Sequence, residues 1–120
     1  MDERLHKALD FSNYMVTLNN QKKMLQEKFH QQSLHYYKGG QFTVDKELIC
    51  FCTILVNADN TTTVLVDDNS IPIEIEDLEE FLDDINNVYF SATSEFLNNY
   101  NKLKTNRSVE KLVDLWVKAF

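Results

Sequence analysis

The chain has 120 residues, of which 43% are hydrophobic, and a formal net charge of −7. This length is typical of a single domain, and no apolar run approaches the roughly 20 residues of a membrane-spanning helix. The start of the chain has no apolar signal segment, and the chain has two cysteines. Both features predict a reducing, intracellular location, the cytoplasm.

Charge is divided unevenly along the chain. Residues 1–40 carry six bases and four acids, residues 41–100 carry one base and thirteen acids, and residues 101–120 carry five bases and two acids. Because an acidic centre repels phosphate groups, we expect neither nucleic acid nor a membrane surface as a partner. The simplest interpretation of the acidic centre is a solvated face that needs no partner.

Residues 2–37 are expected to form one long helix that ends at Gly39-Gly40. Seven of ten positions at alternating four- and three-residue spacing are apolar, as in a bundle or coiled-coil seam. Such a helix would be about 50 Å long, whereas a compact domain of this size is about 35 Å across. We therefore expect a homo-oligomer, most simply a dimer, in which a second copy covers the seam. The expected interface residues on this helix are Phe11, Met15, Leu18, Leu25 and Phe29.

Residues 43–57 fit two structures. The nearly continuous apolar run over residues 48–56 would suit a buried strand. Thr43, followed by Asp45 and Glu47, instead resembles the first turn of a helix, and the apolar residues also fall on one helical face. The length of the run and its acidic first turn favour the helix, with the strand as the alternative.

A β-hairpin is predicted over residues 61–75, because two β-rich runs flank the turn residues 67–70. A four-residue loop closed by Val66 and Ile71 places Pro72, which lacks an N–H, at a non-hydrogen-bonded position. The face expected to pack against helices carries Thr62, Val64, Val66, Ile71, Ile73 and Ile75. The opposite face carries Thr63, Leu65, Pro72 and Glu74.

A long amphipathic helix is predicted over residues 77–104. Asp77 can cap its first turn, with Glu80 three residues later, and apolar residues then recur at helical spacing for about seven turns. A last short helix is predicted over residues 108–120. We expect its apolar edge, with Trp116 and Phe120, to dock on the chain's own long helix, the alternative being a partner's groove.

These elements predict an α+β, mostly helical fold: a long N-terminal helix, a second helix, a β-hairpin, a long amphipathic helix and a short C-terminal helix. A single domain is expected over residues 1–120, with the seam helix at 1–38 and a compact α+β body at 41–120.

No catalytic, cofactor or metal site is expected from the motifs. Cys50 and Cys52 lie in an apolar run without a second ligand pair, so we interpret them as buried, reduced core thiols. The three histidines are interpreted as surface residues. The acidic turn that begins at Asp67 resembles a calcium loop, but the required glycine and glutamate are replaced by Pro72 and Leu78. No nucleophile–base arrangement can be assembled, so an enzyme is not favoured.

Three stretches are similar to small accessory or virion proteins of T4-like marine phages: residues 47–49, 65–73 and 77–81 (ELI, LVDDNSIPI and DLEEF). The resemblance covers about residues 40–104. It implies a phage-encoded assembly or accessory factor that acts by protein contact.

The sequence therefore predicts a non-catalytic, oligomerising interaction, assembly or accessory factor with an unknown protein partner. The first alternative is an acidic decoy that blocks a nucleic-acid-binding site on a host protein, and its binding would weaken steeply with salt. The second alternative, a metal-dependent enzyme, would be stabilised by a divalent ion. The acidic surface of the decoy would comprise Asp67, Asp68, Glu74, Glu76, Asp77, Glu79, Glu80, Asp83 and Asp84.

Overall fold

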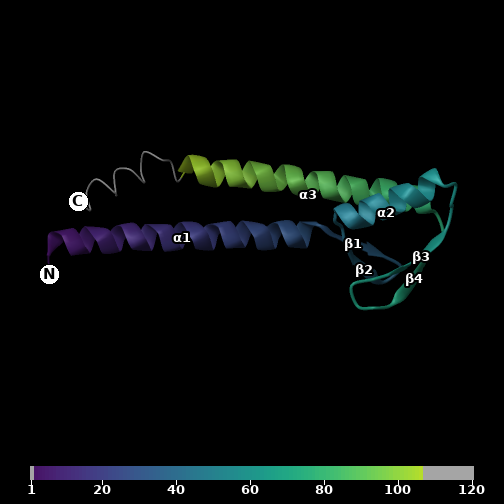
Figure 1. Cartoon of the computed structure of the whole chain (residues 1–120), viewed down its shortest axis with the longest axis horizontal. Helices are drawn as coiled ribbons and strands as arrows, with labels where there is room; N and C mark the ends of the chain where they lie inside the picture. Colours follow the sequence, from purple (N-terminus) through teal and green to yellow (C-terminus); the bar gives the residue numbers. More distant parts are fainter. Residues whose placement is uncertain (1, 107–120) are drawn as a thin grey trace. The chain divides into compact units, whose positions relative to one another are not determined.

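The fold is α+β and mostly helical, as the sequence predicts. The computed structural model describes residues 2–106, and the expected helix at 108–120, with Trp116 and Phe120, lies outside them. Figure 1 shows the elements in chain order. They are α1 (Glu3–Gln32), β1 (Leu34–Tyr37), β2 (Gly40–Thr43), α2 (Lys46–Asn57), β3 (Thr63–Val66), β4 (Pro72–Ile75) and α3 (Leu78–Asn106).

The chain divides into two compact units. The first comprises residues 1–28 and 96–120, of which 2–28 and 96–106 are described, and the second is Phe29–Glu95. The boundary that the sequence placed near residue 40 therefore falls inside the second unit. Both long helices contribute to both units.

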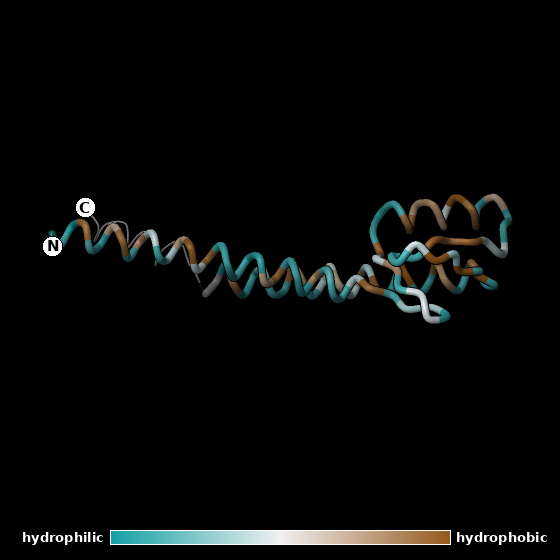
Figure 2. Tube along the Cα trace, turned by 90° about the horizontal axis from the view of Figure 1, so that it is seen from below, coloured by the Kyte–Doolittle hydropathy of each residue, from teal (hydrophilic) through white to brown (hydrophobic). Residues whose placement is uncertain are grey.

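In the first unit, residues of α1 lie next to the C-terminal end of α3. Leu18 lines one cavity together with Tyr100 and Leu103, and Leu25 lines another with Leu103. Hydrophobic residues recur at intervals along α1 and are not gathered in one block (Figure 2). Part of the seam expected to face a second copy thus contacts α3 of the same chain.

The first helix ends at Gln32, five residues earlier than predicted. β1 follows it and pairs antiparallel with β2, from Leu34 opposite Thr43 to Tyr37 opposite Gly40. The turn between them consists of Lys38 and Gly39, with φ of 48° and 78°. Two consecutive left-handed residues form the tight turn whose twist matches a hairpin. Gly39-Gly40 therefore belongs to a strand turn, and the prediction that it ends a helix was wrong.

The helical interpretation of residues 43–57 is confirmed, although α2 starts later than expected. Asp45 is its N-cap, and the Asp45 carboxylate accepts the N–H of Leu48 at 2.8 Å. Thr43, the expected start, is the last residue of β2.

The hairpin of β3 and β4 is present, but its predicted register was wrong by one residue. Leu65 lies opposite Ile73, and Val66 lies opposite Pro72. The faces of β3 are exchanged as a result, because side chains alternate along a strand: Leu65 is buried, whereas Val66 is 65% exposed. On β4 the predicted inner residues Ile73 and Ile75 still pack into the core. The loop has five residues, since the N–H of Asp67 donates to the carbonyl oxygen of Ile71 at 2.9 Å. Asp67 and Ile71 form a hydrogen-bonded pair, so the next pair, Val66 and Pro72, is a non-hydrogen-bonded one and Pro72 needs no N–H.

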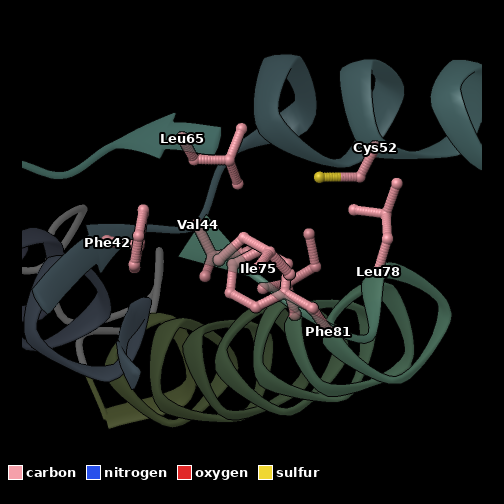
Figure 3. Close-up of a cluster of buried hydrophobic side chains, with 8 residues drawn as sticks. Phe42, Val44, Cys52, Leu65, Ile75, Leu78 and Phe81 are labelled. Carbon is pink, nitrogen blue, oxygen red and sulfur yellow. The ribbon is translucent and has the colours of Figure 1, made fainter. Parts of the chain in front are cut away.

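The core of the second unit gathers around Phe81 of α3. The rings of His35, Tyr37 and Phe42 each meet the Phe81 ring edge-on, with centroids 5.5 Å apart. Side chains from both hairpins, α2 and α3 point toward one another in this core (Figure 3). His35 is half-buried here, so the prediction of a surface histidine at this position was wrong. Asp77 caps α3 as predicted, accepting the N–H of Glu80 at 3.1 Å.

Candidate interaction surfaces

Asp67, expected on the acidic surface, instead accepts hydrogen bonds from the backbone of its own loop. Its side chain is buried, and Oδ1 accepts the N–H groups of Asn69 (2.9 Å) and Ile71 (2.8 Å). Oδ2 accepts the N–H of Gln41 in the other hairpin at 3.3 Å. Its assignment to the acidic surface was therefore wrong, because its oxygens face protein donors.

Asp68 is exposed but is also fixed to β2. Its carboxylate accepts the Thr43 hydroxyl at 2.7 Å, the Thr43 N–H at 3.1 Å and the Gln41 side-chain amide at 3.1 Å. Its own N–H donates to the carbonyl oxygen of Gln41 at 2.8 Å. Partial burial acts to raise the pKa of Asp68, but the hydrogen bonds from Thr43 and Gln41 outweigh it and hold that pKa below its usual value.

Together, Asp67 and Asp68 cover the outer edge of β2. The N–H of Val44 donates to the carbonyl oxygen of Ser33 at 2.8 Å, which fixes the alternation of hydrogen-bonded pairs between β1 and β2. Gln41 and Thr43 then fall at positions whose backbone groups point away from β1. The acidic loop supplies partners for the N–H and C=O of Gln41 and for the N–H of Thr43, and it thus joins the two hairpins.

The remaining predicted acidic residues lie near the start of α3. They are exposed: Glu74, Glu76, Asp77, Glu79, Glu80, Asp83 and Asp84. Glu76 forms an ion pair with Lys38 at 2.7 Å, and this hydrogen bond raises the pKa of Lys38. The Lys38 ammonium also lies 5.5 Å from the centre of the Tyr37 ring. Of these exposed acidic residues, Glu76 is therefore paired with a cation, Lys38, of the same unit.

The α1 residues expected at an oligomer interface are all partly buried. Phe11, Met15, Leu18 and Leu25 are each partly buried in the first unit. Phe29 is partly buried in the second unit, where it lines a cavity.

A second apolar stripe lies elsewhere on α1. Leu5, Leu9 and Val16 are 51%, 45% and 55% exposed. Their spacing of four and seven residues places them on one helical face, away from the partly buried seam. Sequence reasoning missed this stripe because it followed only the longer apolar pattern.

A groove of about 460 Å³ lies on the second unit beside α2. Its apolar lining comes from β2 (Phe42), α2 (Leu48 and Phe51) and β3 (Val66). The carboxylate-bearing residues Asp45, Glu47 and Asp68 complete it with Thr43. The one-residue shift in the register of the second hairpin places Val66 on this exposed face.

A second cavity of about 490 Å³ shares three of these residues, Thr43, Asp45 and Glu47. It is also lined by Lys46 and His30, so its charge is mixed.

The two cysteines differ in exposure. Cys52 is fully buried, and burial raises its pKa to about 11, which keeps the thiol protonated at neutral pH. Cys50 is exposed, so the prediction that both are buried was wrong for this residue. Among residues 2–106, no cluster of three or more His, Cys, Asp and Glu side chains could hold a metal ion. None of the helices described in this range is long and apolar enough to cross a membrane.

Comparison with protein-family models, with curated protein sequences and with solved structures found no match to this chain.

Proposed function

We propose that the protein is a non-catalytic assembly or accessory factor that acts by protein contact as a homo-oligomer, most simply a dimer. The observation that carries the proposal is the exposed stripe of Leu5, Leu9 and Val16 on a helix whose other apolar face is already partly buried. An exposed apolar stripe is stabilised when a second surface covers it. A second copy presents the same stripe, and a two-fold axis brings the two together.

The proposal keeps α1 as the oligomer interface but moves the contact from the seam to the opposite stripe. Leu18 and Leu25 already line cavities with α3 residues, so a second copy gains less by covering them. The resemblance to accessory proteins of T4-like phages supports an assembly role. Under this proposal the chain is phage-encoded and acts in the host cytoplasm or in the virion.

Sedimentation velocity of the wild-type chain and of the double variant Leu9→Asp/Val16→Asp tests the proposal. We expect a dimer at tens of micromolar for the wild type and a monomer for the variant, because two charges would be buried without partners. Both positions are exposed in the single chain, so the helical circular dichroism should be retained. The matched control is Asn19→Asp/Gln26→Asp, also exposed and seven residues apart on α1. A monomeric wild-type chain would contradict the proposal.

The acidic decoy remains a second candidate, favoured by one observation. Seven carboxylate-bearing residues from Glu74 to Asp84 are exposed near the start of α3. A decoy would displace nucleic acid from a basic host protein, and its affinity would fall steeply with ionic strength. Replacing Glu79, Glu80 and Asp83 by their amides should abolish that displacement without changing the oligomeric state.

A further inference from the structure

We propose that the groove beside α2 binds an arginine or lysine side chain, flanked by apolar residues, of a partner protein. This inference goes beyond the proposed oligomer, because it concerns a different surface on the second unit. It rests on the four apolar side chains that line the groove, called its floor, on the three carboxylate-bearing residues that line it, called its rim, and on the hydrogen bonds that fix two of those carboxylates.

The floor of the groove is apolar and partly open to solvent. Of its side chains Phe42 is buried, whereas Phe51 and Val66 are 49% and 65% exposed. These two side chains come from α2 and β3, so the floor is built from separate elements of the same unit. The methylene stem of an arginine or lysine, or a neighbouring leucine, would cover this surface and remove it from water.

The rim carries one sign of charge. Asp45, Glu47 and Asp68 line the groove, and no Lys, Arg or His is among the residues of 2–106 that line it. A cation above the apolar floor would therefore meet three carboxylates. A guanidinium can also bind a carboxylate through two parallel hydrogen bonds. The neighbouring cavity is a weaker candidate for a cation, because Lys46 and His30 line it.

Two of the rim carboxylates are held in place before any partner arrives. Asp68 accepts hydrogen bonds from Thr43 and Gln41, and Asp45 accepts the N–H of Leu48 as the cap of α2. Fixed acceptors lose little conformational entropy when a cation binds. The surplus of acidic residues over 41–100 would also attract a basic segment before contact.

Titration of the full-length, ¹⁵N-labelled chain with the peptide Ac-Leu-Arg-Leu-NH2 tests the inference. We expect saturable shifts of the backbone N–H signals around Thr43, Glu47, Leu48 and Val66. The neutral peptide Ac-Leu-Gln-Leu-NH2 should bind about tenfold or more weakly, because it lacks the charge that the rim would pair. Equal binding of the two peptides would overturn the proposal, as would shifts that do not saturate.

Substitutions at exposed positions locate the peptide-binding site on the protein. Glu47→Gln and Phe51→Ala should each weaken binding of the arginine peptide several-fold. Their matched controls, Glu79→Gln and Phe90→Ala, lie at exposed positions of the same unit and should leave it unchanged. Greater loss with Glu79→Gln than with Glu47→Gln would place the cation on the α3 face and refute the groove. The Leu9→Asp/Val16→Asp variant should keep peptide binding, so failure of the oligomer and failure of the groove give different results.

Discussion

The two hairpins have strands of equal length but are closed in different ways. The turn of β1 and β2 has two residues, Lys38 and Gly39, both in the left-handed region. The loop of β3 and β4 has five residues, and the carboxylate of Asp67 accepts two of its N–H groups. The first hairpin is thus closed by backbone conformation, and the second by a buried side chain.

The difference gives the two turns unequal influence on the fold. The second loop also bonds to Gln41 and Thr43 of the first hairpin, through both Asp67 and Asp68. A change in the second loop should therefore disturb both hairpins, whereas a change in the first turn should act locally.

The largest effect is expected for Asp67→Ala. The substitution leaves the N–H groups of Gln41, Asn69 and Ile71 without their acceptor. Bonds to a charged group contribute about 1.5–3 kcal/mol each and are not additive, so we expect a loss of about 3–5 kcal/mol in the free energy of unfolding. Urea denaturation measures this loss, with Asp83→Ala at an exposed helical position as control. A loss no larger than that of the control would show that the loop does not depend on Asp67.

Gly40→Ala should have the next largest effect, because Gly40 is the point where the first hairpin approaches β4. An added Cβ would lie 3.0 Å from Cγ1 and 3.1 Å from Cδ1 of Ile73, and 3.2 Å from the carbonyl oxygen of Tyr37. Overpacking of this kind costs about 1–3 kcal/mol. Thermal unfolding should show the loss, and Ile73→Val, which removes Cδ1, should rescue part of it. Absence of any rescue would mean that the steric contact with Ile73 is not the cause.

Gly39→Ala separates backbone strain from crowding. A Cβ at this position would meet no atom within 4 Å, but φ is +78°. The expected loss is about 1 kcal/mol, from the left-handed conformation alone. Thermal unfolding beside Gly40→Ala provides the comparison. A loss larger than that of Gly40→Ala would reverse the order proposed here.

The smallest effect concerns pH and Asp68. Because folding depresses the pKa of Asp68, its contribution to stability is present above the unfolded pKa of about 3.9 and is lost as pH falls through the folded value. Asp68→Asn should therefore reduce the drop in melting temperature between about pH 4 and pH 2. Glu79→Gln, an exposed acid without these bonds, should not reduce it. Identical pH profiles for wild type and Asp68→Asn would remove Asp68 from the acid-sensitive contacts.

Local patterns were enough for the fold class and for the existence of all three described helices, although α1 ends five residues earlier than predicted. Helical spacing and the Asp77 cap located the start of α3, whereas α2 starts after its Asp45 cap and not at Thr43 as predicted. The first hairpin was missed because the four- and three-residue spacing of the predicted helix continues through Gln32 to Tyr36. Local β-forming residues on both sides of Lys38-Gly39 were the signal that could have found it.

Contacts between distant residues could not be read from one sequence. The predicted register of the second hairpin was wrong because the Asp67 side chain bonds to the loop backbone and lengthens the loop. A slip of one residue exchanges the two faces of a strand. Asp68 bonds to Gln41 and Thr43, which lie 27 and 25 residues away in the sequence and belong to the hairpin that was missed. The groove likewise depends on Phe51 and Val66 lining the same hollow, which only the folded chain shows.

The cover that the acidic loop places on β2 has a consequence for solubility. A strand edge with free N–H and C=O groups is a template on which another chain can add a strand. Asp67 and Asp68 occupy the N–H and C=O of Gln41 and the N–H of Thr43, so a second β2 edge finds fewer free backbone groups there. We expect protonation of Asp68 to weaken that cover while the pairing of β1 with β2 is kept. Acid should therefore promote strand-to-strand aggregation of this protein before it unfolds the rest of the chain.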